Sequence, residues 1–313
     1  VEVGIKMAIQ YHYNQSSNKS TFIALKNGYH GDTFGAMSSG GRGIFSTPFE
    51  NHLFEVKYID VPVEGMEDKS FEQLKYIIKN KNVAGFIFEP LLQGAAGMVM
   101  YNPQILSDII GYCKNQNIIT IADEVSTGFG RTGKFFAANY LENKPDIICM
   151  SKGLTGGVMA LGATSTTDKI YNAFLSEDKS KMFLHGHSYT GNPLACSVAL
   201  ASLELMNQNN TWDYISMIQN SHQLFMKENQ NHPHILNVRN IGVILAITIK
   251  SDSNETYFNY LRDNIYDFFI ERKIILRPLG NVIYVMPPYC ISKDELKLIY
   301  TTILELLDKI KLK

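Results

Sequence analysis

Three short apolar segments of this chain each end in an ionisable residue, and this arrangement limits the folds that the sequence allows. The segments are VAGFIFEP (residues 83–90), NIITIADE (117–124) and DIICMSK (146–152). Continuous apolar runs of this length are typical of strands that are buried on both faces of a parallel sheet. We therefore expect an α/β fold with a mainly parallel sheet.

A helix is predicted between the first two segments. Asn102 is a suitable N-cap, Pro103 suits the first helical turn, and apolar residues follow at helical spacing. Strand, helix and strand in this order imply parallel strands joined by a right-handed crossover. Ligands of such sheets bind beyond the carboxyl ends of the strands. We therefore expect Glu89, Asp123 and Lys152 to meet at one edge of the sheet.

The pattern changes after about residue 205, so we expect a large domain at 1–205 and a smaller α+β domain at 206–313. In the second domain, residues 235–249 are typical of two strands around a turn, and residues 255–273 of a helix. IILRPLG (274–280) and NVIYVMPPY (281–289) are predicted as two further strands. Ser292 and Glu295 form a capping box that begins the last helix. The first residues have apolar side chains at helical spacing without a cap, so we expect further residues upstream of Val1.

Composition excludes several classes of partner. Hydrophobic residues make up 45% of the chain, charged residues 19%, and the formal net charge is −1. This charge gives no electrostatic basis for binding nucleic acid or an anionic membrane surface. No apolar run approaches the roughly 18 to 20 residues of a membrane span. We expect a cytoplasmic protein without nucleic-acid or membrane partners.

Cysteine and histidine spacing gives no metal site. The four cysteines, Cys113, Cys149, Cys196 and Cys290, are far apart and are expected to be buried free thiols of a reducing compartment. The eight histidines show no ligand spacing. We therefore expect no bound metal.

The glycine-rich stretch GFGRTGK (128–134) matches two nucleotide-binding patterns in part. Residues 123–127 separate it from the preceding strand, whereas a dinucleotide fingerprint needs its glycines in the strand-to-helix turn itself. The phosphate-loop pattern requires Ser or Thr after the lysine, and Phe135 stands there. Both nucleotide interpretations are therefore disfavoured.

A carboxylate and a lysine at neighbouring strand ends suit pyridoxal phosphate. This cofactor forms a Schiff base with a lysine amine, and its ring nitrogen takes an acidic partner. Because burial lowers the pKa of a lysine, we expect Lys152 at a poorly solvated strand end. Two alternatives remain open: Lys152 reaches out to water, or Asp123 pairs with a nearby arginine.

Several motifs together resemble the class III aminotransferases of PLP fold type I. The matching segments are NGYHGDTFGAMS (27–38), EPLLQGAAGM (89–98), IADEVSTGFGRTGKFFA (121–137), SKGLTGG (151–157), HGHSYTGNPLACSVALASL (185–203) and RPLGNVIYVMPPY (277–289). The resemblance covers nearly the whole chain. It implies a PLP fold type I large domain that binds pyridoxal 5'-phosphate, and a smaller α+β C-terminal domain.

The resemblance implies roles for residues around the cofactor. Lys152 matches the lysine that bonds to the cofactor, Asp123 the carboxylate at the pyridine nitrogen, and Tyr29 the aromatic ring that stacks on the cofactor. Glu89 matches a strand-end carboxylate near the cofactor, and a purely structural hydrogen-bond acceptor is the alternative. The upstream residues would hold, by the same resemblance, a turn for the cofactor phosphate and an aromatic wall of the substrate pocket.

The resemblance also implies a shared site in a homodimer. His187 and Ser188 match a turn that reaches the cofactor phosphate of the neighbouring subunit, and they replace the Pro-Thr pair that is usual there. Ser188 keeps a hydroxyl for the phosphate, whereas the imidazole of His187 changes the pocket. Gly186 matches a backbone position at the substrate.

Three further residues are candidates for binding substrate. Arg277 matches the arginine that holds the substrate carboxylate, a task suited to its planar guanidinium. Its alternative is a surface arginine after a strand. Tyr284 and Arg131 are weaker candidates for the same pocket.

The implied reaction is a ping-pong transamination. RPLGNVIYVMPPY narrows the resemblance to the members that convert the keto acid 8-amino-7-oxononanoate to 7,8-diaminononanoate in biotin synthesis. S-adenosylmethionine is the expected amino donor, and lysine is the alternative. Two other functions remain open: a class III ω-aminotransferase that acts on ornithine, 4-aminobutyrate or a related amine, and a binding or regulatory protein that lost the chemistry. Intact Lys152, Asp123 and Tyr29 argue against the latter.

Overall fold

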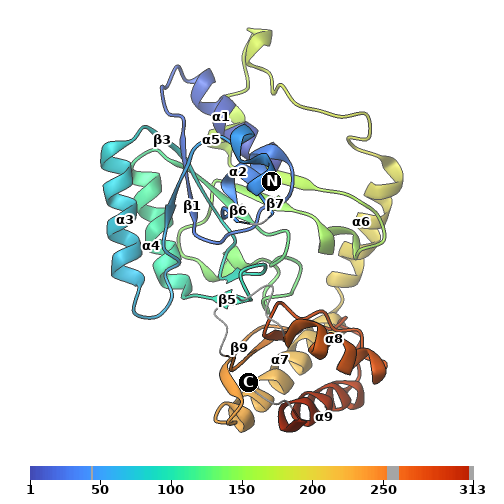
Figure 1. Ribbon diagram of the computed structural model, residues 1–313. Helices are drawn as coiled ribbons and strands as arrows, with labels where there is room; N and C mark the ends of the chain where they lie inside the picture. The colour runs from blue at the N-terminus through green and yellow to red at the C-terminus, as the bar shows by residue number, and fades with distance from the viewer. Residues whose placement is uncertain (44, 252–260, 310–313) are drawn as a thin grey trace. The chain divides into compact units, whose positions relative to one another are not determined.

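The chain divides into two compact units, each described below by itself (Figure 1). The computed structural model describes residues 1–43, 45–251 and 261–309. The first unit comprises Val1–Gln93, Tyr101–Gly128 and Phe136–Leu203, and the second comprises Gly94–Met100, Phe129–Phe135 and Glu204–Lys313. Two short segments that precede residue 205 thus belong to the second unit. The sequence pattern did not single them out.

A six-stranded sheet in the order β2-β1-β3-β6-β7-β8 forms the centre of the first unit. Its strands are β1 (Thr21–Leu25), β2 (Val56–Ile59), β3 (Val83–Phe88), β6 (Ile119–Asp123), β7 (Ile147–Met150) and β8 (Ala163–Thr166). Neighbouring strands are parallel except for β7 and β8, which are antiparallel. The three predicted strands are therefore confirmed, and so is the mainly parallel sheet.

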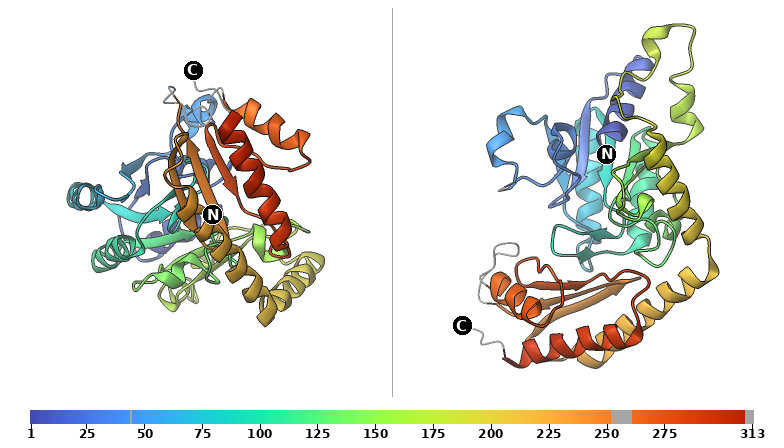
Figure 2. Two further views of the ribbon diagram at one scale, coloured as in Figure 1. Left: turned by 90° about the horizontal axis from the view of Figure 1, so that it is seen from below. Right: turned by 90° about the vertical axis from the view of Figure 1, so that its right-hand side faces the viewer.

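Helices cover both faces of this sheet (Figures 1 and 2). They are α1 (Glu2–Asn14), α2 (Phe34–Ser39), α3 (Glu67–Asn80), α4 (Pro103–Asn115) and α5 (Asp168–Asn172). Helix α6 (Pro193–Met206) is largely exposed. Short 3-10 turns are η1 (Thr47–His52), η2 (Ala137–Tyr140), η3 (Lys152–Thr155) and η4 (Lys179–Lys181). The predicted cap of α4 is confirmed, because the side chain of Asn102 accepts a hydrogen bond from the Gln104 N–H at 2.7 Å.

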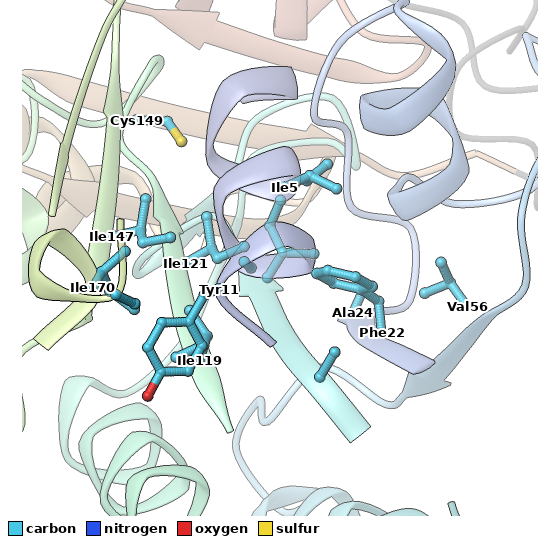
Figure 3. Packing of buried hydrophobic residues seen from close by; sticks show 14 residues of the cluster. Ile5, Tyr11, Phe22, Ala24, Val56, Ile119, Ile121, Ile147, Cys149 and Ile170 are labelled. Carbon is cyan, nitrogen blue, oxygen red and sulfur yellow. The ribbon is translucent and has the colours of Figure 1, made fainter. Parts of the chain in front are cut away.

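The core under α1 consists of side chains from this helix and from the strands beneath it (Figure 3). Ile5 and Tyr11 of α1 pack with Phe22 of β1, Ile121 of β6 and Ile147 of β7. The face that α1 buries differs in part from the predicted one. Ile9 and Tyr13 continue the apolar pattern, yet both are exposed, and the buried residues of α1 include Tyr11 and His12 instead.

The second unit contains a three-stranded antiparallel sheet in the order β11-β10-β9. Its elements are α7 (Asn209–Asn229), β9 (Ile235–Ile241), β10 (Ile244–Ile249), α8 (Leu261–Glu271), β11 (Val282–Val285) and α9 (Lys293–Lys309). The short strands β4 (Leu92–Gln93) and β5 (Val99–Met100) lie between β3 and α4 in sequence. The two strands predicted at 235–249 are confirmed.

One predicted strand of the second unit is wrong. In IILRPLG only Leu279 pairs, through an isolated bridge to Val282. Pro278 has no N–H to donate to a sheet, and Gly280, with φ of 61°, turns the chain just before β11. Ile275 is 92% exposed, whereas Leu276 and Leu279 are buried, so the segment packs on the core without joining the sheet.

Both predicted helices of the second unit are present. The capping box is confirmed, because Ser292 N–H donates to Glu295 Oε2 at 2.8 Å and Glu295 N–H donates to Ser292 Oγ at 3.2 Å. The predicted helix at 255–273 is described from Leu261 onward, and its first residues lie outside the described ranges. Ile310, the last position of the predicted apolar stripe of α9, also lies outside them.

The four cysteines are free thiols, as predicted, but not all are buried. Cys113 and Cys149 are buried, whereas Cys290 is exposed because it lies in the turn before α9. Among the described residues, no helix is long and apolar enough to cross a membrane. The same residues contain no cluster of three or more His, Cys, Asp or Glu side chains that is arranged for a metal ion.

Candidate active site

The carboxyl ends of β3, β6 and β7 meet at one edge of the first sheet. Phe88, the last residue of β3, pairs with Ala122 of β6, and Asp123 pairs with Cys149 of β7. Glu89 directly follows β3, Asp123 ends β6, and Lys152 follows β7. The predicted arrangement of these strand ends at one edge is confirmed.

Asp123 is held in place by its neighbours. It is 4% exposed, and its Oδ1 accepts a hydrogen bond from the Val125 N–H at 3.1 Å. Its Oδ2 lies 2.8 Å from Nδ1 of His30, whose side chain is 1% exposed. An ionised carboxylate only accepts hydrogen bonds, so Nδ1 of His30 carries the proton and donates it to Asp123. These two bonds fix the orientation of the carboxylate.

Glu89 anchors the loop that carries Tyr29 and His30. Its Oε2 accepts a hydrogen bond from the backbone N–H of Tyr29 at 3.1 Å, and its carbonyl oxygen accepts one from the hydroxyl of Tyr101. The Tyr29 hydroxyl donates to Oδ1 of Asp32 at 3.0 Å, and 42% of Tyr29 is exposed. Glu89 thus makes the structural contact of the open alternative, and its predicted position near the cofactor stays a prediction. The loop places an accessible aromatic ring at the same edge.

Lys152 lies in an unusual backbone conformation directly after β7. Its φ of 40° is in the left-handed region, and it begins the 3-10 turn η3. Non-glycine residues held in this region are concentrated at functional sites. The side chain is exposed, so the expected poorly solvated position is wrong for this chain by itself. The physical reason is that strand pairing ends at Met150, after which η3 and the exposed residues 156–160 lead away from the sheet.

Gly186, His187 and Ser188 lie in an exposed turn before α6. The His187 N–H donates to Thr190 Oγ1 at 3.2 Å, and Nδ1 of His187 accepts from the Tyr189 N–H at 3.2 Å. These bonds hold the turn itself. The predicted reach of this turn to a cofactor of a second subunit stays a prediction.

Arg131, Tyr284 and Arg277 belong to the second unit. The backbone carbonyl of Arg131 accepts from the Val243 N–H at 3.0 Å, and burial lowers the pKa of its guanidinium. Tyr284 is half-buried on β11, opposite Ala246, and Arg277 is exposed ahead of that strand. Their predicted roles at the substrate stay predictions.

Sequence reasoning missed His30, although a signal was present. NGYHGD directly follows β1 (TFIAL), a strand that the pattern analysis left unassigned. The rule that functional residues follow the carboxyl ends of parallel strands would have placed His30 beside Glu89 and Asp123. Short strands such as β1 give a weak periodic signal, and this explains the omission.

Comparison with known proteins identifies the family. The profile of the family "Aminotransferase class-III" matches residues 1–307. This chain belongs to the class III aminotransferases. A relative in this family is the adenosylmethionine-8-amino-7-oxononanoate aminotransferase of Synechococcus elongatus, which is 41% identical over 99% of this chain and 74% of the relative.

Solved class III structures are also similar. The adenosylmethionine-8-amino-7-oxononanoate aminotransferase of Methanocaldococcus jannaschii has a TM-score of 0.91 and 36% identity, covering 100% of this chain and 73% of that one. An amine transaminase from an uncultivated Pseudomonas species, solved with PLP bound, has a TM-score of 0.89 and 27% identity over 98% of this chain and 74% of that one. The PLP fold type I predicted for this aminotransferase is therefore confirmed.

The residues at the sheet edge fit pyridoxal phosphate chemically. Asp123 is a buried carboxylate that is already oriented by two donors, as a protonated ring nitrogen requires. Lys152 supplies an accessible amine, and Tyr29 supplies an accessible aromatic face. The aldehyde, the protonated ring nitrogen and the flat ring of pyridoxal phosphate would each have a suitable partner at this edge of the sheet.

Proposed function

We propose that this class III aminotransferase transfers an amino group to 8-amino-7-oxononanoate and forms 7,8-diaminononanoate in biotin synthesis. The observation that carries the proposal is the common sheet edge of Lys152, Asp123 and Tyr29. The names of the relatives from S. elongatus and M. jannaschii support this choice of acceptor. S-adenosylmethionine, which both names include, is the proposed donor.

Three residues bind and orient the pyridoxal phosphate in this proposal. Lys152 Nζ would hold it covalently, the carboxylate of Asp123 would accept from its ring N–H, and the ring of Tyr29 would stack on it. When bound, this cofactor supplies an electrophilic carbon for amines and a ring that withdraws electrons from the neighbouring carbon. His30 donates to Asp123 and so keeps that carboxylate aligned. His187 and Ser188 of a second subunit hold the phosphate.

Lys152 also moves a proton. Its Nζ would accept the proton that leaves the donor carbon carrying the amino group. Lys152 begins the η3 turn and is exposed outside the sheet, where a bound donor can approach it. Glu89 supports the step indirectly, since it anchors the loop that carries Tyr29 and His30.

An absorbance experiment tests the cofactor and the reaction together. The purified protein is mixed with pyridoxal phosphate and then with S-adenosylmethionine, and the visible spectrum is followed by stopped flow. We expect a visible band that decays with the donor and returns when 8-amino-7-oxononanoate is added. A protein that stays colourless with added cofactor is the binding protein considered above. A fast reaction with ornithine or 4-aminobutyrate, and none with the keto acid, means a different class III ω-aminotransferase. Lysine in place of S-adenosylmethionine tests the remaining donor.

Arg277 is proposed to hold the distant carboxylate of the keto acid, and Tyr284, Arg131 and the backbone of Gly186 are proposed to contact the substrate. Loss of a charge-assisted hydrogen bond corresponds to about 1.5 to 3 kcal/mol, or about 10- to 100-fold. Arg277→Ala should slow the keto-acid half-reaction by that factor.

The half-reaction with S-adenosylmethionine should change less, because the carboxylate of this donor lies next to the reacting carbon. Arg262→Ala, which removes an exposed arginine on α8, is the control. Equal losses in both half-reactions would show that Arg277 does not select the acceptor.

We further propose that the enzyme is a homodimer. α6 is rich in apolar residues, but it buries Ala195 and Ala199 and exposes 68% of Leu194 and 63% of Leu200. Large exposed apolar surface of this kind marks an interface. Sedimentation should therefore give twice the chain mass, and Leu200→Glu should shift the protein toward the monomer. A monomeric wild type at every concentration would contradict this proposal.

The proposed location is the cytoplasm. The free thiols of Cys113 and Cys149 are typical of a reducing compartment. The near-neutral charge of −1 supports small-molecule substrates as its ligands, with no nucleic-acid or membrane partner. Fractionation of cells that express the protein tests this location directly.

A further inference from the structure

Gly28, on the loop between β1 and His30, is surrounded by polar atoms. A Cβ atom added to Gly28 would lie 3.2 Å from the carbonyl oxygen of Leu25, 3.3 Å from Nε2 of His30 and 3.6 Å from Nε2 of Gln93. All four residues are buried in the first unit. The φ of Gly28 lies outside the left-handed region, so backbone conformation does not require glycine here. A side chain at this position would crowd these polar atoms, so glycine keeps them clear of an apolar group.

Two buried atoms beside Gly28 have no hydrogen-bond partner within the described ranges. They are Nε2 of His30 and Oε1 of Gln93. The other polar atom of each side chain is occupied: Nδ1 of His30 pairs with Asp123, and Nε2 of Gln93 donates to the Lys26 carbonyl at 2.9 Å. Gln93 is 0% exposed. Buried polar atoms are nearly always hydrogen-bonded, so these two atoms require a small polar ligand.

We propose that one buried water molecule bridges Nε2 of His30 to Oε1 of Gln93 beside Gly28. A water here donates one hydrogen to each of the two acceptors, which satisfies both. Gln93 is then a positioning residue: it acts on Asp123 through the water and His30. The site lies inside the first unit and involves no part of the substrate pocket.

The bridge supports the tautomer of His30 that Asp123 selects. With a water donating to Nε2, the imidazole keeps its hydrogen on Nδ1, where it points at Oδ2 of Asp123. Without the bridge, Nε2 is buried without a partner, and the Nδ1–H bond to Asp123 loses this support. The effect of this on catalysis rests on the proposed function, whereas the water site and the His30 tautomer do not.

Two variants should remove the water by different means. Gly28→Ala places a methyl group 3.3 Å from Nε2 of His30, where it excludes the water, and leaves the hydrogen bond from Gln93 to Lys26 in place. Gln93→Met leaves Gly28 unchanged and removes the acceptor. Gly43→Ala is the matched control, because the added methyl group meets no atom within 4 Å. His30→Asn identifies the His30 signals in nitrogen-15 NMR spectra.

The first measurement uses the protein without cofactor. A high-resolution crystal structure of the wild type should show a solvent peak within hydrogen-bond distance of both Nε2 of His30 and Oε1 of Gln93. Nitrogen-15 spectra should show a protonated Nδ1 and a hydrogen-bonded, unprotonated Nε2. Both variants should lose the peak and shift the Nε2 resonance, and Gly43→Ala should do neither. Absence of the peak in the wild type, or identical His30 spectra in all proteins, would overturn the proposal.

The second measurement loads the same proteins with pyridoxal phosphate. Each variant should lower turnover about 5- to 10-fold, equivalent to about 1 to 1.4 kcal/mol for one hydrogen bond. The pH dependence of the visible band should shift, and the KM for the donor should stay nearly constant. The double variant should lose no more than either single variant, because both remove the same water. If the losses in turnover of the two single variants add in the double variant, the proposed water bridge is wrong. A loss of the cofactor reaction with intact NMR results would instead count against the proposed function alone.

Discussion

At the scale of single residues, Lys152 and Glu124 differ in exposure and in role. Lys152 lies in a left-handed conformation on an exposed turn, where its amine is accessible. Glu124, the next residue after Asp123, is fully buried and accepts from Thr127 Oγ1, from the Ala137 N–H at 3.1 Å and from the Ala138 N–H at 2.6 Å. Lys152 is therefore available for the reaction, whereas Glu124 stabilises the fold.

Lys152→Ala should bind pyridoxal phosphate without a covalent bond. The contacts of Asp123 and Tyr29 remain, but turnover should fall by about 10³-fold or more because the amine and its proton transfer are both lost. Reduction with borohydride followed by peptide mapping checks the assignment, since only the wild type should retain the cofactor on a peptide. Lys179→Ala, on the exposed turn η4, is the control. Cofactor trapped on another lysine would show that Lys152 has been misassigned.

Glu124→Gln should destabilise the fold by about 2 to 3 kcal/mol. Three donors point at the two carboxylate oxygens, and a glutamine would place its own NH2 group against at least one of them. Burial raises the pKa of Glu124, so part of the loss is offset by the removal of a poorly solvated charge. Urea unfolding of this variant and of Glu142→Gln, an exposed control, measures the difference. Equal stability of the Glu124→Gln and Glu142→Gln variants would show that the hydrogen bonds of Glu124 do not stabilise the fold.

At the scale of elements, strands with long apolar runs were predictable and close backbone contacts were not. VAGFIF, ITIAD and IICM are recognisable by themselves, because strands buried in a parallel sheet are mostly apolar along their length. The capping boxes and N-caps are equally local. The contact between segment 129–135 and the β9–β10 turn has no such signal, since it joins residues about a hundred positions apart. Asp123 was predictable from its strand, whereas its partner His30 required the pairing of β1 with β3.

Gly242 makes the contact with segment 129–135 possible. Its φ is 52°, and a Cβ atom here would overlap the backbone of Arg131, Thr132 and Gly133. Gly242→Ala should destabilise the second unit by about 3 kcal/mol or more, since backbone atoms have little room to move. The amide of Val243, which donates to the Arg131 carbonyl, should lose its protection in hydrogen exchange.

Gly65→Ala is the matched control for this variant. Gly65 has a φ of 82°, but an added Cβ atom meets nothing within 4 Å, so only the strain of about 1 to 2 kcal/mol applies. Equal effects of the two substitutions would show that overlap with segment 129–135 is unimportant.

At the scale of the whole molecule, stability should depend on pH through a buried histidine. His222 lies between α7, α9 and β10, with Nδ1 2.6 Å from the Tyr300 hydroxyl and Nε2 3.1 Å from the Val243 carbonyl. Burial lowers its pKa from 6.5 to about 4. Because the folded-state pKa is the lower one, the unfolded chain binds a proton between these values that the folded chain does not. This contribution is complete above pH 6.5 and is lost as the pH falls toward 4.

The expected loss of unfolding free energy across this pH window is about 3 kcal/mol. Urea unfolding of the wild type and of His222→Gln at several pH values measures it. Glutamine keeps one donor for Val243 and one acceptor for Tyr300 but does not titrate, so its curve should be flatter by about that amount. Parallel curves would mean that His222 is not the group responsible.

The second unit is assembled from three separate pieces of chain, and this restricts how it can be recombined. Arg239 on β9 donates from Nε to the Met98 carbonyl at 2.7 Å and from Nη2 to the Gly97 carbonyl, and burial lowers its pKa to about 10. A fragment that starts at Glu204 keeps all three strands of the sheet. It lacks the carbonyls of Gly97 and Met98, so the guanidinium of Arg239 loses these two acceptors. It also loses the Arg131 carbonyl that Val243 uses. A cassette exchanged between homologous enzymes must therefore carry residues 94–100 and 129–135 along with the C-terminal part, and a single crossover near residue 204 yields a mismatched hybrid.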